Sequence, residues 1–557
     1  MKIKFVLALC CLTIAGCQSQ LTMNTQPDQF INNHVARLKP LEVQSNLAYW
    51  DAAVTGKSEA YAHSSSLNLK LRQMHSDPQA FAYLKAQRKV GQINDPLVAR
   101  QIDRLYYAFL DNQIDERLLK EIVELSSQIE EKFSTFRGTV DGRELTVNDI
   151  TKILKTETNN DMRKKAWAAS KQVGPVVVED IIRLVKLRNR AARSAGSENF
   201  HTMRLKSGEQ DPAVLDKLFA ELDELTAIPF AELKGTLDGQ LANMCGIEIS
   251  AIRPWHYHDP FFQETPMVQD VDLDVYYKGK DIKQLSAAFY DGIGLNVDDI
   301  LENSDLYERK GKNPHGFCTD IDRVGDVRIL CNIKDVEYWM TVQLHELGLA
   351  VYFKYNDPQV PYLLRGPAHS FTTEAIAMMF GRLSKNSLWM QQMLGLSDAE
   401  REKLQTVTEY QQRLGQLIFA RWAMVMYNFE KRLYANPDQN LNKLWWDLVE
   451  KYQFVKRPEG RDQPDWAAKI HIANSPVYYH NYLLGEMLAS QIHHDMAEKI
   501  PAMNTDKGIS YVGQKGIADY LIKNIFAPGN VYQYNEMIKR ATGEYLTPKY
   551  FVEDFVK

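Results

Sequence analysis

Several features that mark other classes of protein are absent from this sequence of 557 residues. No stretch reaches the roughly 20 consecutive apolar residues that a transmembrane helix needs, because charges interrupt the longer apolar segments, as Arg382 does within 378–383. Neither sign of charge dominates, since 66 basic side chains are balanced by 71 acidic ones, and this balance gives no support to nucleic-acid binding. The chain also has no internal repeat, no low-complexity tract and no P-loop.

The N-terminus carries an apolar run that is too short to cross a bilayer. Residues 5–14 follow a basic start and lead into Ile-Ala-Gly-Cys at 14–17. This order is typical of a signal peptide, and the cysteine makes it similar to a bacterial lipobox. We therefore expect residues 1–16 to be a signal peptide, Cys17 to be acylated, and 17–28 to form a polar tether. A short membrane-anchored helix is the alternative.

The predicted lipid anchor also indicates a compartment. Gln18 follows the cysteine, where an aspartate would suggest retention in the inner membrane. By analogy with enteric bacteria, we expect the protein in the cell envelope, lipid-anchored to the outer membrane and facing the periplasm. An oxidising periplasm permits disulfides, and Cys245, Cys318 and Cys331 are the cysteines outside the predicted signal and lipidation segment. We expect Cys318 and Cys331 to form a disulfide across a short hairpin; three free thiols are the alternative.

The periodicity of the remaining chain predicts an all-α protein. Apolar residues recur at three- and four-residue spacing in many segments, separated by clusters of turn residues. Strand signals are confined mainly to 315–333, where we expect a minor β-hairpin. No linker divides residues 29–557, so we expect one large catalytic domain, and two helical lobes around a deep substrate groove would suit its length.

One predicted helix, residues 335–355, contains part of a zinc-binding motif. Asp335 suits its N-cap, and His345 and Glu346 stand in its middle. A zinc-peptidase helix needs histidines at i and i+4, which emerge on one face, with a glutamate that polarises the zinc-bound water. Here the i+4 position is Leu349. Taken alone, a histidine followed by a glutamate is more often an ordinary helix surface or core.

A second predicted helix, residues 370–383, follows a loop rich in proline and glycine. Glu374 is expected in its first turn, facing back toward the previous helix, as a third zinc ligand should. The alternative is a carboxylate that interacts with the helix dipole.

These motifs together resemble the angiotensin-converting enzyme family of peptidyl-dipeptidases, especially its bacterial members. The resemblance rests on HELGLAVY at 345–352, the proline-rich loop, TEAI at 373–376, the two cysteines just ahead of the first motif, and KIHI at 469–472 followed by two tyrosines. It covers roughly residues 30–545. The helices within 46–204 are similar in pattern to the lid and first lobe of that family.

The resemblance implies a role for each matching residue. His345 and Glu374 would be zinc ligands, and Glu346 would be the general base. Tyr482, with His471 beside it, would stabilise the oxyanion. Lys469 and Tyr479 would hold the terminal carboxylate of the peptide, which is how an exopeptidase measures two residues from the end.

Several positions depart from the family pattern. Leu349 replaces the second zinc histidine, and leucine cannot coordinate a metal whose catalytic sites normally have three protein ligands. Met378 stands where an aspartate supports a zinc histidine, and Thr319 replaces a histidine. Tyr257 falls near the expected carboxylate-binding glutamine. Asn481 stands where animal members have a chloride-linked arginine, so chloride activation is not implied.

These observations leave three hypotheses about function. The first is a zinc exopeptidase that releases dipeptides from the C-termini of peptides, impaired by Leu349. The second is a catalytically inactive relative that binds peptides or partner proteins, of unknown identity, as a lipoprotein. The third is an endo-acting oligopeptidase, which Lys469 and Tyr479 disfavour because an endopeptidase needs no carboxylate anchor. The first is preferred, with weak or absent zinc binding.

Overall fold

The structure is a computed structural model that describes residues 26–91, 93–266 and 271–556. The predicted signal peptide and Cys17 lie outside the described residues. The first helix, α1, begins at Pro27, so residues 27 and 28, which we assigned to the tether, are helical. Within the described ranges, no helix is both long and apolar enough to span a membrane.

The first part of the chain is helical apart from one small hairpin. Its helices are α1 (Pro27–Thr55), α2 (Ser58–His75), α3 (Pro78–Val90), α4 (Pro96–Leu110), α5 (Glu116–Thr135), α6 (Val147–Thr156), α7 (Asn160–Lys171), α8 (Val173–Ser194), α9 (Phe200–Ser207) and α10 (Pro212–Cys245). Strands β1 (Gly138–Val140) and β2 (Arg143–Leu145) pair antiparallel between α5 and α6.

The second part contains the residues singled out by the sequence. Its helices are α11 (Asp274–Tyr277), α12 (Ile282–Gly292), α13 (Asp298–Asn303), α14 (Glu337–Lys354), α15 (Ser370–Gly381), α16 (Ser387–Leu394), α17 (Asp398–Ala435), α18 (Leu441–Gln453), α19 (His471–Asn474), α20 (His480–Lys499), α21 (Gly516–Leu521), α22 (Tyr534–Thr542) and α23 (Lys549–Phe555). Its strands are β3 (Phe317–Asp320), β4 (Val327–Leu330), β5 (Asn504–Thr505) and β6 (Gly508–Ile509). The predicted all-α class is confirmed.

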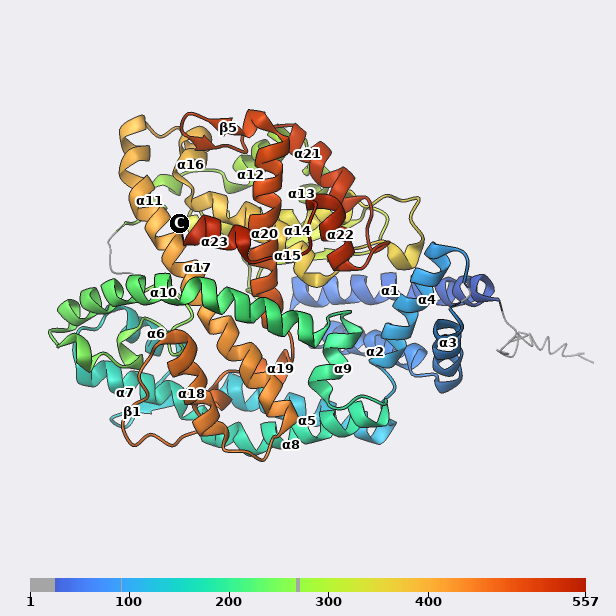
Figure 1. The fold of residues 1–557 in the computed structure, drawn as a ribbon, viewed down its shortest axis with the longest axis horizontal. Helices are drawn as coiled ribbons and strands as arrows, with labels where there is room; N and C mark the ends of the chain where they lie inside the picture. The colour runs from blue at the N-terminus through green and yellow to red at the C-terminus, as the bar shows by residue number, and fades with distance from the viewer. Residues whose placement is uncertain (1–25, 92, 267–270, 557) are drawn as a thin grey trace, which may run out of the picture.

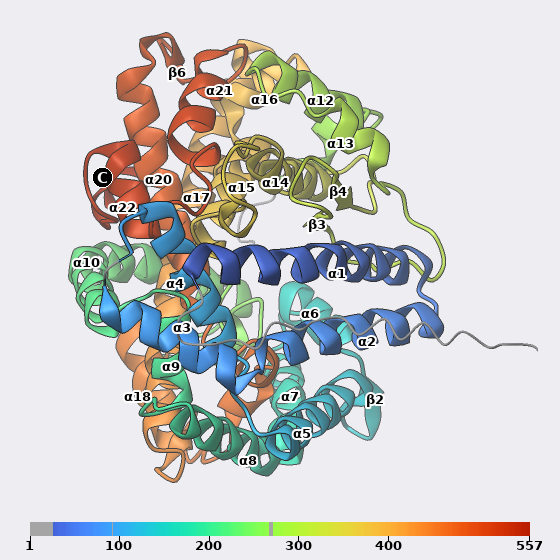
Figure 2. The same cartoon turned by 90° about the vertical axis from the view of Figure 1, so that its right-hand side faces the viewer.

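The helices form two halves (Figure 1). One half holds α11–α16 and α20–α23, the other holds α5–α9 and α18, and α17 packs against helices of both, including α16, α20, α8 and α18. In Figure 2, α1 and α2 run side by side across one flank of the molecule, and α1 lies next to β3. A largely continuous hydrophobic core extends through both halves.

The hairpin predicted within 315–333 is present, but the predicted disulfide is not. Strand β3 pairs with β4 so that Cys318 lies opposite Ile329, and Cys318 and Cys331 are both free thiols. Cys331 is therefore diagonal to Cys318, and diagonal neighbours are about 7–8 Å apart, beyond the usual Cα separation of a disulfide. The N–H of Cys331 donates instead to the carbonyl of Asp305, which holds this end of the strand in place.

Candidate active site

Helix α14 carries His345, Glu346 and Leu349, and its start differs from the prediction. It begins at Glu337, with Val336 at the N-cap. The carboxylate of Asp274, which is distant in sequence, accepts the N–H of Glu337 at 2.9 Å. The expected cap, Asp335, accepts the N–H of Gly279 instead. The start of this helix is thus fixed by tertiary contacts.

Two glycines bring the helices of the site together. A Cβ atom on Gly348 of α14 would lie 2.8 Å from the Cα of Ala377 in α15, which is closer than real Cβ contacts. On the other side of α15, a Cβ atom on Gly485 of α20 would lie 3.3 Å from the Cβ of Glu374 and from the sulfur of Met378. Helix α15 is therefore held tightly between α14 and α20.

This packing places His345 beside Glu374. The imidazole Nε2 lies 3.5 Å from a carboxylate oxygen of Glu374, and the two side chains are 28% and 19% exposed. We had predicted Glu374 in the first turn of its helix. Because α15 begins at Ser370, Glu374 is its fifth residue and lies just after that turn. The alternative role, interaction with the helix dipole, does not explain why this carboxylate lies so close to His345.

The charged forms of these groups are disfavoured by burial. Burial raises the pKa of Glu346 to about 8, with the charge of Glu374 as the second cause. Burial, followed by the nearby Glu486, raises the pKa of Glu374 to about 7. Burial lowers the pKa of His345 to about 4. One carboxyl oxygen of Glu346 is buried and has no hydrogen-bond partner among the described residues.

Position 349, one helical turn after His345, offers no metal-binding atom. Leu349 follows His345 by one helical turn, so the two share a face of α14, and Leu349 is half-buried. Nowhere in the described ranges do three or more histidine, cysteine, aspartate or glutamate side chains gather in a way that could hold a metal ion. Met378 follows Glu374 by one turn, and its thioether is only a weak hydrogen-bond acceptor.

A second cluster lies around Lys469, which is 7% exposed. Its amine donates to the side-chain oxygen of Gln263 at 2.6 Å. The rings of Phe261, Trp422 and Tyr479 surround the same amine at 5.5, 5.2 and 5.3 Å. Burial lowers its pKa to about 8, although Asp259 and Glu264 act in the opposite direction. These five residues, Lys469, Gln263, Phe261, Trp422 and Tyr479, are called the lysine cluster below.

Gln263 is the residue of this cluster that sequence reasoning missed. Tyr257, which we had placed near the expected glutamine, is buried, and its hydroxyl donates to Asp238 instead. The signal available in the sequence was the Asp-Pro turn at 259–260, which precedes Gln263 and is a common turn initiator.

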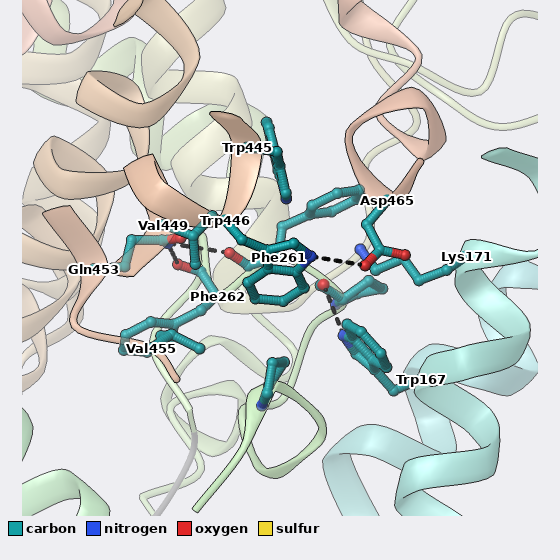
Figure 3. A pocket seen from close by; sticks show the side chains of 12 residues that line it. Trp167, Lys171, Phe261, Phe262, Trp445, Trp446, Val449, Gln453, Val455 and Asp465 are labelled. Carbon is teal, nitrogen blue, oxygen red and sulfur yellow. Dashed lines mark hydrogen bonds between the residues drawn. The ribbon is translucent and has the colours of Figure 1, made fainter. Parts of the chain in front are cut away.

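A tight turn holds Gln263 in position. The carboxylate of Asp259 accepts the N–H groups of Phe261, Gln263 and Glu264. The amide of Gln453, from α18, donates to the carbonyls of Phe261 and Phe262 (Figure 3). This pair of bonds supports Phe262 in the left-handed region, with φ of 53°. A small cavity lies beside the turn and is lined in part by Trp167, Lys171 and Trp446.

Aromatic residues connect the lysine cluster to Glu374. His471 contacts Tyr479 edge-on with ring centroids 5.3 Å apart, and Tyr479 contacts Tyr482 at 5.5 Å. Burial raises the pKa of Tyr482, and the charge of Glu374 is the second cause, so this hydroxyl lies within electrostatic reach of that carboxylate. Nδ1 of His471 is buried without a hydrogen-bond partner in the described part of the chain. The residues predicted from both motifs thus lie in one continuous region.

Comparison with known proteins agrees with this arrangement. The sequence model of the family described as "Angiotensin-converting enzyme" matches residues 21–235 and 252–550. The chain belongs to the angiotensin-converting enzyme family. It therefore carries a peptidase domain of the metallopeptidase type, in a family that is generally zinc-dependent.

Two relatives match over shorter segments. "Thermostable carboxypeptidase 1" of Pyrococcus furiosus is 23% identical over 271 residues, which are 43% of this chain and 51% of that protein. "Inactive angiotensin-converting enzyme-related protein" of Caenorhabditis elegans is 26% identical over 141 residues, which are 24% of this chain and 16% of that protein. The matched segments thus span about half or less of these relatives.

A buried polar network surrounds Asn481, the position from which the sequence implied no chloride activation. The side-chain oxygen of Asn481 accepts from Gln210 at 2.7 Å, and Gln210 in turn bonds the ring of His480 at 2.9 Å. All three side chains are buried. Burial lowers the pKa of His480 well below its ordinary value, so the ring is neutral at pH 7.

Proposed function

We propose that this protein binds peptides by their free C-terminus and is built to release dipeptides from them, with hydrolysis impaired by Leu349. The observation that carries the proposal is the buried amine of Lys469, held by Gln263 beside Tyr479 and His471. This lysine cluster adjoins the region of His345, Glu346 and Glu374.

The chemistry of the lysine cluster suits a carboxylate. A lysine amine has three donors, and the side-chain bond recorded for this one uses a single donor, to Gln263. An ammonium removed from water is stabilised by an ionised acceptor, and charge-assisted hydrogen bonds are about twice as strong as neutral ones. A peptide C-terminus supplies that acceptor, and this feature favours an exopeptidase over an endo-acting enzyme.

The proposed catalytic groups are incomplete. His345 and Glu374 would supply two zinc ligands, Glu346 would take a proton from the attacking water, and Tyr482 with His471 would donate to the oxyanion. Leu349 offers no donor, and the residues present do not make the three-ligand site that catalytic zinc requires. We therefore propose weak zinc binding and slow or absent turnover.

A catalytically inactive peptide- or protein-binding role is the second candidate. Leu349 favours it, because losing even an outer contact of a zinc ligand costs roughly 10–100-fold in metal affinity or activity, and here a ligand itself is replaced. The lysine cluster does not depend on zinc, so both candidates predict recognition of a free C-terminus.

The test compares matched peptides that end in a carboxylic acid or in an amide. Losing a charge-assisted hydrogen bond should cost about 1.5–3 kcal/mol, so the acid should bind about 10- to 150-fold more tightly at pH 7. Titration calorimetry measures both affinities whether or not cleavage occurs. Equal affinities would point to an endo-acting enzyme or to another use of the site.

We further propose that the protein is a lipoprotein of the cell envelope, acylated at Cys17 and anchored to the outer membrane on its periplasmic side. The Ile-Ala-Gly-Cys sequence at 14–17 supports this location. An envelope location would bring it into contact with peptides outside the cytoplasm.

A further inference from the structure

A strained residue lies in the loop between α19 and α20, which connects His471 to Tyr479 and Tyr482. Val477 has φ of 57°, in the left-handed region, and it is 6% exposed. A β-branched residue in this region is a true outlier, and such strain persists only where the surrounding structure enforces it. The contacts that enforce this conformation therefore also determine where the following tyrosines lie.

One of these contacts is the buried carboxyl group of Glu430. Glu430 lies on α17, is 2% exposed, and its Oε1 accepts the N–H of Val477 at 2.9 Å. The N–H of a residue in a loop has no helical or strand partner by default, and a buried N–H without an acceptor is costly. The carboxyl oxygen of Glu430 thus stabilises Val477 in its strained conformation.

The end of α19, just before this loop, is held by Arg188 of α8. Its Nη2 donates to the carbonyl of Ala473 at 2.6 Å, and its Nη1 donates to the hydroxyl of Tyr434. Arg188 is 7% exposed, and burial raises the pKa of Glu430 to about 8 although the N–H of Val477 and the charge of Arg188 act in the opposite direction. The segment from Ala473 to Val477 is therefore bound at both ends by two buried side chains from different helices.

The sequence positions connect this loop to the lysine cluster. Val477 precedes Tyr479 by two residues and Tyr482 by five, and α20 begins at His480. Rotation of Val477 into an ordinary backbone region would redirect the start of α20 and move the Tyr479 ring away from Lys469. We propose that Glu430 is a positioning residue, which holds Val477 in the left-handed conformation so that Tyr479 and Tyr482 face the bound peptide. This role rests on the proposed function.

The turn around Gln263 is built in the same way. Phe262 also has a positive φ, and a buried glutamine, Gln453, binds the carbonyls beside it. Gln263 and Tyr479 of the lysine cluster thus each follow a strained residue closely in the sequence. Each strained residue is held by a side chain from α17 or α18. Strain of this kind is concentrated at functional sites in proteins.

The experiment uses substitutions at 430 and 477 in the full chain. Glu430→Met removes the acceptor at similar length, whereas Glu430→Gln keeps an oxygen that can accept the N–H of Val477. Glu409→Met, an exposed position on the same helix, is the matched control. Glu430→Met should weaken binding of a free-acid peptide about tenfold, and Glu430→Gln and Glu409→Met should stay near the parent.

The decisive variant combines Glu430→Met with Val477→Gly. Glycine adopts positive φ without strain, so it should recover most of the lost affinity if Glu430 acts by holding this conformation. An unchanged affinity in folded Glu430→Met, or no recovery in the double variant, would overturn the proposal. A purely structural role for Glu430 would lower thermal stability without recovery by glycine.

Hydrogen exchange provides a readout that needs neither peptide nor catalysis. The Val477 amide should be strongly protected in the parent and in Glu430→Gln, and should exchange on the order of tenfold faster in Glu430→Met. Fast exchange of this amide in the parent would contradict the inference even if Glu430→Met fails to fold. If the parent binds acid and amide peptides equally while the exchange pattern holds, the proposed function fails and the loop restraint stands.

Discussion

The pH dependence of peptide binding follows from the environment of Lys469. Burial lowers the pKa of its amine to about 8, from an ordinary value of about 10.4. The charged form, which binds a carboxylate, is therefore present below pH 8 and is lost as the pH rises through 8. The amine is about 90% protonated at pH 7 and about 10% protonated at pH 9. Affinity for a free-acid peptide should thus fall about tenfold over this range.

The tyrosine and histidine side chains beside Lys469 do not titrate in the same window, whereas Glu374 and Glu346, whose pKa values burial raises to about 7 and about 8, do. Burial raises the pKa of Tyr479 and of Tyr482 above the ordinary tyrosine value, so both hydroxyls stay protonated to pH 9. Burial lowers the pKa of His471 to about 4, so its ring stays neutral from pH 7 upward. The amide peptide, which lacks the charge that pairs with Lys469, should show no comparable decrease.

The assay is titration calorimetry with the acid and amide peptides at pH 7, 8 and 9. Lys469→Met keeps the apolar stem of the side chain and removes the amine, and should weaken binding of the acid by about 1.5–3 kcal/mol at pH 7. It should also remove the tenfold decrease that the amine causes, so that any remaining pH dependence comes from Glu346 and Glu374. The reasoning is refuted if the affinity of the acid is the same at pH 7 and pH 9, or if Lys469→Met binds the acid as the parent does.

Two further predictions concern packing and location. Gly348→Ala would place a methyl group 2.8 Å from the Cα of Ala377, so α15 must move. We expect a loss of about 1–3 kcal/mol in the free energy of unfolding, measured by denaturant titration. An unchanged denaturation midpoint would contradict the tight packing of α14 on α15. Cys17→Ser should release the protein from the membrane fraction, and continued partition with the membrane would exclude the lipid anchor.

The features that could be predicted from the sequence depend on local patterns. Spacing of apolar residues predicted the helices, and the strand signals within 315–333 predicted the hairpin of β3 and β4. The positions of His345 and Glu374 followed from two motifs joined by one loop, and the structure brings their side chains together.

The features that sequence reasoning missed depend on distant partners. Asp274 caps α14 and Gln263 joins Lys469, although each pair is separated by tens to hundreds of residues. The strained conformation of Val477 depends on Glu430 of another helix, and no local pattern predicts a β-branched residue at positive φ. The disulfide was predicted from an expected hairpin in an oxidising compartment, whereas the register of the strands sets Cys318 opposite Ile329.

Our central proposal is that Leu349 limits metal binding in an otherwise assembled site. The direct measurement is zinc content and dipeptide release from N-blocked peptides, for the parent and for Leu349→His side by side. Leucine and histidine have similar bulk, so the imidazole should fit beside His345.

We expect little bound zinc and slow dipeptide release in the parent. The variant should bind zinc at least about 100-fold more tightly and release dipeptides faster, with partial recovery because Met378 cannot orient a zinc histidine strongly. A parent that already binds zinc fully and cleaves as fast as the variant, or a folded variant that gains neither property, would contradict the account.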